Sequence, residues 1–333
     1  MKLTISFFAA LLFATALTFS QTPAGDFVAE PANGGSIIVI KDYIGKASDV
    51  TIPSEIEGLP VVEIGDYAFS ECVYLKTIAL PDTVLKIGEG AFYGCASLQS
   101  VTLGNSMLKI EDWAFRSCAT LQTVTFGNSL MKIGSYAFRG CESLQIVALP
   151  DTVQEIGDMA FSECASLQRA SLGKSLELLG EGAFSQCFSL QSVTIPDNVL
   201  EIYDITFQDC ASLHSVVLGK SVQEIGGMAF YGCKSLTDVT FQDSVQAIDN
   251  KAFSGCESLQ SVALPDSLLT IGDMAFDSCT SLQSVTFGNS LKEIGRYAFR
   301  DCTSLQGVSL PDSVETIGHS AFDEGTSLHG DTF

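Results

Sequence analysis

The sequence predicts an elongated repeat solenoid of about twelve coils, each 23 residues long. The eleven cysteines recur every 23 residues from Cys72 to Cys302. A row of phenylalanines recurs at the same interval from Phe69 to Phe322, three residues ahead of the cysteine position. A fixed period of 20 to 50 residues is typical of solenoids and related arrays. The 333 residues are therefore expected to form one elongated domain rather than two compact ones.

The composition is that of an acidic globular protein. Hydrophobic residues make up 46% of the chain and charged residues 17%, which is too apolar for a disordered chain. The 17 Lys and Arg against 39 Asp and Glu give a net charge of −22. Nucleic-acid binding and docking on an anionic membrane both need a basic surface, so the charge argues against both.

Each coil is expected to begin with a short parallel strand and a turn. The segment LQSVTL (98–103) alternates apolar and polar residues, which points Val101 and Leu103 inward and Ser100 and Thr102 outward. The residues that follow are turn formers, because Pro presets φ and Gly and Asn tolerate positive φ. The turn reads Pro-Asp at 81–82, 150–151, 196–197, 265–266 and 311–312, and Gly-Asn or Gly-Lys at 104–105, 127–128, 173–174, 219–220 and 288–289.

A second extended segment and a short helical turn complete the expected coil. The second segment points Val153 and Ile156 inward and ends at a glycine in most coils. The helical turn carries Ala-Phe-x-x-Cys, and an acidic residue such as Asp112 often opens it, where it suits exposed backbone N–H groups. Because one coil cannot bury its own apolar residues, stability is expected to come from stacking neighbours. At a strand spacing of about 4.8 Å, twelve coils would span roughly 55 Å.

The cysteines are expected to be free and buried. They share one repeat position, so neighbouring side chains lie about 5 Å apart with parallel Cβ vectors, which fits poorly with a disulfide Cβ–Cβ distance of about 3.8 Å. No CxxC pair or local histidine accompanies them, which argues against a metal cluster. They are best interpreted as a ladder of small hydrophobic residues, and no cofactor or metal is expected.

The sequence predicts an exported chain with four regions. Residues 1–20 have the pattern of a signal peptide, with Lys2 before an apolar run and small residues near two cleavage positions, after Ala16 or Ser20. A lead-in follows at 21–42, then the solenoid at 43–328 and a tail at 329–333. Because no second long apolar run exists, the mature chain is expected to be secreted, or held at the cell surface by a partner.

The repeat resembles the BspA-like leucine-rich repeats, also called the Treponema pallidum class. The family unit reads roughly LxxIxLPxSLxxIGxxAFxxCxx, and both LQSVTIPDNVLEIYDITFQDCAS (190–212) and LQSVALPDSLLTIGDMAFDSCTS (259–281) match it. The segment 43–69 looks like the family's usual first unit. The resemblance implies a leucine-rich-repeat solenoid. It also implies a secreted or surface protein of bacteria or protists, several of which are associated with adhesion.

A few positions depart from the repeat, and no cluster among them predicts a pocket. These are Gly325 for Cys, Thr206 for Ala, Tyr203, Glu111 and Asp249 for Gly, and Gln242 for Pro or Gly.

The outward strand positions form the candidate binding face. Rows of small hydroxyl side chains on a regular sheet can hydrogen-bond a protein or a glycan, and residues such as Arg169, Ile146 and Val217 interrupt the rows and could tune specificity. The face consists of Thr77, Ser100, Thr102, Thr123, Thr125, Ser192, Thr194, Ser215, Thr240, Ser261, Ser284 and Thr286.

The expected function is non-catalytic binding or adhesion through this face, with an extracellular protein or glycan as partner. The chain contains neither HExxH nor GxSxG, and its carboxylates are spread as ladders rather than as an isolated pair, so no enzyme activity is expected. The alternatives are a passive structural or self-assembling matrix component, a purely solvated strand face, an ice- or crystal-facing surface, and weak calcium binding between acidic turns.

Overall fold

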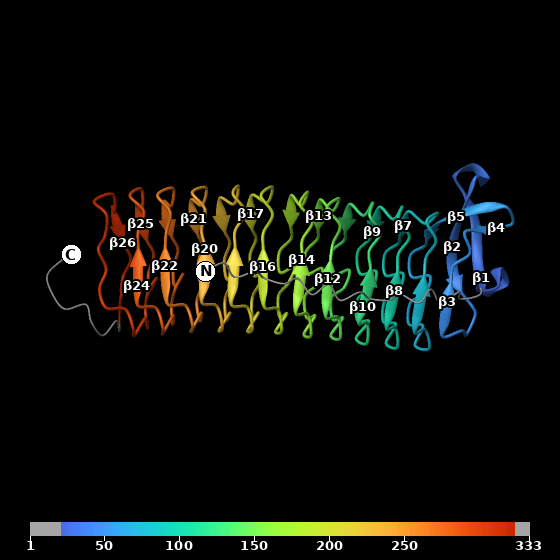
Figure 1. The fold of residues 1–333 in the computed structure, drawn as a ribbon, viewed down its shortest axis with the longest axis horizontal. Coiled ribbons are helices and arrows are strands. Elements are labelled where there is room, and N and C mark those ends of the chain that lie inside the picture. The colour runs from blue at the N-terminus through green and yellow to red at the C-terminus, as the bar shows by residue number, and fades with distance from the viewer. Residues whose placement is uncertain (1–20, 324–333) are drawn as a thin grey trace, which may run out of the picture.

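The computed structural model describes residues 21–323 and is a solenoid of stacked coils, as the sequence predicts. Figure 1 shows the coils standing side by side in a straight row along the long axis. Each regular coil contributes a three-residue strand to one side and a two-residue strand to the other, and strands of most neighbouring coils pair in parallel. We call these two sides the strand face and the short-strand face.

The strand face carries the segments that the sequence predicts as the first strand of each coil. Its strands are β3 (Asp49–Thr51), β6 (Thr77–Ala79), β8 (Ser100–Thr102), β10 (Thr123–Thr125), β12 (Ile146–Ala148), β14 (Arg169–Ser171), β16 (Ser192–Thr194), β18 (Ser215–Val217), β20 (Asp238–Thr240), β22 (Ser261–Ala263) and β24 (Ser284–Thr286).

The short-strand face carries the second extended segment of each coil. Its strands are β7 (Lys86–Ile87), β9 (Lys109–Ile110), β11 (Lys132–Ile133), β13 (Glu155–Ile156), β15 (Leu178–Leu179), β17 (Glu201–Ile202), β19 (Glu224–Ile225), β21 (Ala247–Ile248), β23 (Thr270–Ile271), β25 (Glu293–Ile294) and β26 (Thr316–Ile317).

An N-terminal cap closes one end of the solenoid. The elements are η1 (Ala24–Asp26), β1 (Phe27–Ala32), η2 (Asn33–Gly35), β2 (Ile37–Tyr43), β4 (Glu55–Ile56) and β5 (Leu59–Ile64). Strand β1 pairs antiparallel with β2, and β2 continues through β5 into the short-strand sheet. The residues expected as a lead-in thus form the first layer of the stack. The signal peptide expected at 1–20 and the tail expected at 329–333 lie outside the described residues.

The core is a continuous stack of phenylalanine rings, which confirms their inward placement. From Phe69 to Phe299 every ring of the ladder is fully buried, and the stack extends at one end to Tyr43 and at the other to Phe322. Neighbouring centroids from Phe69 onward lie 4.9 to 5.7 Å apart with nearly parallel planes. Such offset stacking adds to the free energy gained by burying the rings.

The segment expected as a short helical turn is a run of tight turns instead. Its hydrogen bonds span three residues, as in Arg116 N–H to Trp113 O at 3.0 Å, and adjacent residues leave the helical region because Trp113 and Ser117 have φ of 60° and 62°. The remaining amides bond to the next coil, as Phe115 N–H does to Ala137 O at 2.7 Å. The helical propensity of this segment is therefore overridden by bonding between coils.

The acidic residue before this segment also bonds between coils. Asp112 Oδ1 accepts a hydrogen bond from Ser135 N–H of the next coil at 2.7 Å, and Asp158 Oδ1 accepts one from Glu181 N–H at 2.9 Å. The sequence predicts the acceptor correctly but not that its donor belongs to the neighbouring coil.

All eleven cysteines are free and buried, as the sequence predicts, and they also serve as donors. Cys118 Sγ lies 3.1 Å from Phe92 O of the preceding coil, and the same contact of 3.0 to 3.3 Å recurs at each cysteine from Cys95 to Cys302. Phe92 O already accepts Cys95 N–H, so the thiol uses its second lone pair. A cysteine in this ladder therefore joins two coils and does more than fill space.

Candidate functional site

The strand face is divided into four separate sheets, and the expectation of one regular face is wrong. The sheets are β3-β6-β8-β10, β12-β14, β16-β18-β20 and β22-β24. Three gaps separate these sheets, between β10 and β12, between β14 and β16, and between β20 and β22, and a fourth lies between β24 and residues 307–309. We call these four gaps seams. The arrows of these strands can be followed along the middle of Figure 1.

Each seam lacks a backbone hydrogen bond that joins paired coils elsewhere. Where coils pair, the amide after one strand donates to the last carbonyl of the next, as in Leu149 N–H to Ser171 O at 3.0 Å. At the β14–β16 seam the equivalent groups are Leu172 N–H and Thr194 O, and neither has a hydrogen-bond partner in the part of the chain that the structure describes. The same bond is missing at the other three seams, where the amides are those of Phe126, Phe241 and Phe287.

The residue that opens the turn explains the seams. Where coils pair closely this residue is glycine, and a Cβ added to Gly173 would lie only 2.2 Å from Pro150 O of the preceding coil. Glycine is the residue that permits such close backbone approach. The coil after each seam has a proline at this position instead, and its ring carbons hold the two coils apart. These prolines are Pro150, Pro196, Pro265 and Pro311.

Two further coils show how far this explanation extends. Gln242 also carries a Cβ at the turn position, and its coil pairs through a stretched bond of 3.3 Å from Leu218 N–H to Thr240 O. Pro81 is an exception, because Ile52 N–H still reaches Ala79 O at 3.0 Å. The first coil is longer, with Val50 opposite Ile78, so its turn is not equivalent to the others.

Two of the seams open into hollows on the strand face. The larger, of about 550 Å³, lies at the β14–β16 seam. Its lining is mixed, with apolar Ala170, Leu172, Ile195 and Pro196 beside polar or charged Ser171, Lys174, Ser192, Thr194 and Asp197. The smaller, of about 300 Å³, lies at the β10–β12 seam. Ala170 occupies the inward strand position, where the other regular coils have Val or Ile. The missing methyl groups enlarge this hollow, and a column-by-column comparison of the repeats could have revealed them.

The two coils that form the larger hollow are also the most loosely joined away from the strand face. Strands β15 and β17 do not pair, although the short-strand sheet is otherwise continuous among the described coils. Phe184 and Phe207 are 5.7 Å apart, the widest step in the ring ladder. Two of the departures from the repeat, Tyr203 and Thr206, lie in the second of these two coils, but neither lines the hollow. Glu111 and Asp249 replace the same glycine as Tyr203 without breaking the sheet, so a Cβ alone does not explain this break.

All twelve residues of the candidate binding face lie on the strand face and are exposed or half-buried. The register brings them together only within a sheet, as with Thr102 beside Thr125 and Ser192 beside Ser215. Of these twelve residues, Thr77 is the one whose hydroxyl is hydrogen-bonded to another side chain. Its Oγ1 donates to Asp49 Oδ1 at 2.7 Å. Their part in binding stays a prediction.

The carboxylates of the acidic turns next to this face are bonded to the neighbouring coil. Asp82 Oδ1 accepts Asn105 N–H at 2.6 Å, and Lys174 Nζ lies 2.7 Å from Asp151 Oδ2. These bonds hold the pKa of Asp151 below its ordinary value, chiefly through the Lys174 side chain. Among residues 21–323, no group of three or more His, Cys, Asp or Glu side chains is placed to hold a metal ion.

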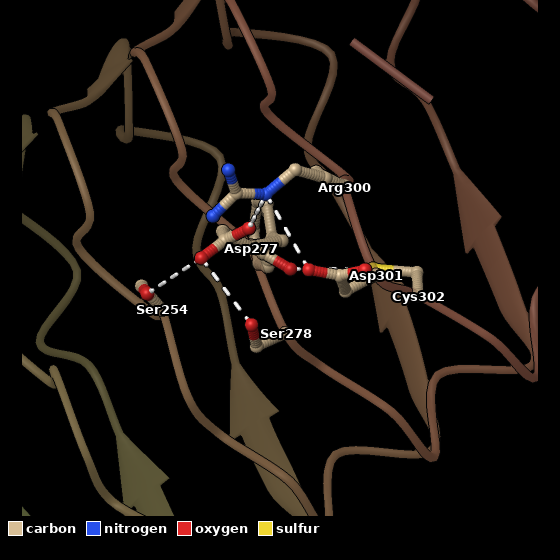
Figure 2. A network of polar contacts seen from close by, with 7 residues as sticks. Ser254, Asp277, Ser278, Arg300, Asp301 and Cys302 are labelled. Carbon is tan, nitrogen blue, oxygen red and sulfur yellow. Dashed lines mark hydrogen bonds and ion pairs between the residues drawn. The ribbon is translucent and has the colours of Figure 1, made fainter. Parts of the chain in front are cut away.

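A partly buried ion pair joins three coils away from the strand face. Figure 2 shows Arg300 Nε donating to Asp277 Oδ1 at 2.7 Å and the Ser254 hydroxyl lying 3.4 Å from Asp277 Oδ2, with Asp301 Oδ2 3.4 Å from the same Nε. The side chain of Asp277 is only 9% exposed, so Arg300 provides the charge that makes its burial tolerable. The arrangement is a structural cross-link with no open position for a ligand.

A family model confirms what the repeat suggests. The model of the BspA-type leucine-rich repeat region matches residues 43–151, 131–260 and 224–332, which together cover most of the chain. The chain belongs to the BspA-type leucine-rich repeat family. Membership in this family indicates a protein-binding or surface-type module. No curated protein matches the chain significantly.

Solved structures of bacterial leucine-rich repeat proteins share the fold. A T. pallidum leucine-rich repeat protein is 30% identical with a TM-score of 0.51, covering 72% of this chain and 91% of its own. A protein from Bacteroides ovatus is 28% identical with a TM-score of 0.50, covering 87% and 94%. The pneumococcal vaccine antigen PcpA, at 21% identity and a TM-score of 0.50, covers 86% and 90% and supports the fold alone. Within the described residues of this BspA-type chain, no helix is long and apolar enough to cross a membrane.

Proposed function

We propose that this BspA-type chain is a non-catalytic extracellular binding module that recognises a protein or glycan through its strand face. The observation that carries the proposal is the strand face itself. It presents exposed hydroxyl side chains from parallel strands in register, and it is hollowed at two seams. Solenoids commonly use such an extended face for partners. Export through residues 1–20 would place this face outside the cell, secreted or held at the surface by the partner.

The test is binding of labelled residues 21–333 to a panel of matrix proteins, glycans and intact cells. The triple variant Thr102→Lys, Thr125→Lys, Thr194→Lys adds three charges to the strand face, where all three side chains are exposed. The matched control Gln154→Lys, Gln223→Lys, Gln246→Lys adds the same charge next to the short-strand face, where these side chains are also exposed. Both variants should keep the fold, because neither touches the core.

The proposal predicts saturable binding that the strand-face variant loses and the control variant keeps. Binding that both variants lose equally, or that neither loses, would contradict the assignment to the strand face. Absence of binding to every member of the panel, together with a mass that rises with concentration in sedimentation, would favour a self-assembling structural component instead.

A further inference from the structure

Three arginines among the described residues lie over aromatic rings, and Arg116 differs from the other two. All three occupy one repeat position in the run of tight turns that follows the short-strand face, three residues after an aromatic residue. Arg139 forms an ion pair with Glu163 at 2.6 Å, and Arg300 forms the pair with Asp277 that Figure 2 shows. Within residues 21–323, Arg116 has neither an ion pair nor a side-chain hydrogen bond.

The Arg116 guanidinium is held between two rings of neighbouring coils. Its central carbon Cζ lies 5.8 Å from the ring centroid of Trp113 in its own coil and 5.8 Å from that of Tyr136 in the next coil. Cation–π contacts restrict the guanidinium without using its five N–H donors. The Arg116 side chain is only half-buried, so a ligand can reach these donors from solvent.

The repeat explains why Arg116 lacks the carboxylate that Arg139 has. Glu163 stands 24 residues after Arg139, and the residue 24 after Arg116 is Gly140. A Cβ built on Gly140 would be no closer than 3.8 Å to its nearest neighbour, Ser117, which is ordinary van der Waals contact. Gly140 therefore leaves open the place from which a glutamate reaches the arginine one coil further on.

The two repeats around Arg116 are locally basic in an acidic chain. Residues 96–141 contain four Lys or Arg and two Asp or Glu, a net charge of +2, whereas the whole chain carries −22. Both acids are already engaged, because Asp112 accepts a backbone N–H of the next coil and Glu111 lies 3.7 Å from Lys86 Nζ. The local charge thus favours an anionic group at a place where the protein supplies none.

We propose that Arg116, together with Trp113 and Tyr136, binds an acidic side chain of a partner protein. A glutamate or aspartate of the partner lies beside Arg116 as Glu163 lies beside Arg139, and the partner surface around it covers the indole of Trp113, which is 36% exposed. The Arg139–Glu163 pair shows that a glutamate side chain fits this arrangement. Trp, Tyr and Arg are also the residues that most often dominate binding at protein interfaces. The site lies outside the strand face, so the inference goes beyond the proposed function.

The variant Gly140→Glu tests the site by giving Arg116 a carboxylate from the chain itself. Glu163 has φ of 62° at the equivalent position, so a backbone at φ 73°, as in Gly140, accepts this side chain. Gly255→Glu is the matched control, because it adds the same charge at the same repeat position in a coil where Tyr231 replaces the arginine. Arg116→Gln removes the cation directly.

The probe is a phage-displayed library of random twelve-residue peptides without tryptophan. The library is depleted on immobilised Gly140→Glu protein and then selected on immobilised residues 21–333. Trp113 is the only tryptophan of the chain, so its fluorescence reports occupation of the site. We expect enriched peptides that contain Asp or Glu and change this fluorescence saturably. They should bind at least tenfold more weakly to the Arg116→Gln and Gly140→Glu proteins, and as tightly as before to Gly255→Glu.

A second comparison identifies the two groups that meet. Changing the acid of a selected peptide to its amide should weaken binding to the unmodified protein tenfold and leave binding to Arg116→Gln unaltered. Failure to enrich a peptide, enrichment of peptides without an acid, or equal binding to all variants would overturn the proposal. Arg116-dependent binding of oligogalacturonides, with no peptide selected, would assign the site to acidic glycans and would also overturn it.

The strand-face variant separates this inference from the proposed function. Peptides held at Arg116 should bind the protein with the three Thr→Lys changes within threefold of their original affinity. If they instead lose affinity with those changes and keep it with Arg116→Gln, the site at Arg116 is refuted and the binding face stands.

Discussion

The buried thiol ladder should make the protein unfold when the pH rises above the ordinary thiol pKa. Burial raises the pKa of these thiols above their usual 9.0, to about 11 at Cys72 and about 12 at Cys302, and further up in the interior. The thiols with a raised pKa are Cys72, Cys118, Cys141, Cys164, Cys187, Cys210, Cys233, Cys256, Cys279 and Cys302. Their stabilising contribution is complete below pH 9 and is lost as the pH rises toward the folded-state pKa.

The size of this loss follows from the protons released on unfolding. At pH 9.5 an unfolded thiol with pKa 9.0 gains about 0.8 kcal/mol by ionising, whereas the folded thiol stays protonated; at pH 8 the gain is under about 0.1 kcal/mol. Ten such thiols lower the free energy of unfolding by about 7–8 kcal/mol between the two pH values. That is comparable to the whole usual stability of a domain, about 5–15 kcal/mol.

Denaturant melts under reductant at pH 8.0 and 9.5 measure this difference. The double variant Cys187→Ala, Cys210→Ala should lose some stability at pH 8 but show a pH-dependent drop smaller by about 1.6 kcal/mol. A thiol reagent should react with native protein slowly and with all eleven cysteines in denaturant. A drop below about 2 kcal/mol, or rapid labelling of the native thiols, would refute the reasoning from burial.

Three further outcomes follow from the structure. Phe184→Ala should cost about 3–5 kcal/mol in urea melts, because it removes a fully buried ring from the stack; a loss under about 1 kcal/mol would contradict its inward placement. Arg300→Ala should cost about 1–3 kcal/mol, since it leaves the buried Asp277 carboxylate without its cation, and Asp277→Asn should restore part of that stability in a double variant. Millimolar calcium should leave the Tm unchanged, because turn carboxylates such as that of Asp151 are already engaged; a clear rise would contradict this.

The period and the core could be predicted from the sequence because each depends on one coil at a time. The 23-residue spacing of Phe and Cys identifies inward positions directly, and Val101 and Leu103 are buried where alternation places them. The bends after Trp113 and Ser117 could not be predicted, because bulky and polar residues alike occupy left-handed backbone positions there. Hydrogen bonds to the neighbouring coil hold them in that conformation.

The seams depend on contacts between coils, so the pattern within one repeat does not predict them. Pro-Asp and Gly-Lys are equally good turns within a single coil. Whether β14 and β16 approach closely depends on what Pro196 meets in the coil before it, which cannot be read from one repeat alone. The candidate face was therefore placed correctly on the strands, but its division and its hollow at Ala170 were not predicted. The thiol contact from Cys118 to Phe92 O likewise crosses between coils and leaves no signal within one repeat.

Amide hydrogen exchange at single-residue resolution tests most directly the claim that turn prolines divide the strand face. The amides of Leu80, Leu103, Leu149, Ile195 and Leu264 donate to the next coil. They should exchange slowly, and those of Phe126, Leu172, Phe241 and Phe287, which face seams, should exchange at least a hundredfold faster. A hundredfold difference corresponds to about 2.7 kcal/mol of local protection. Equal protection of the two groups would mean that the strand face is continuous and would contradict the account.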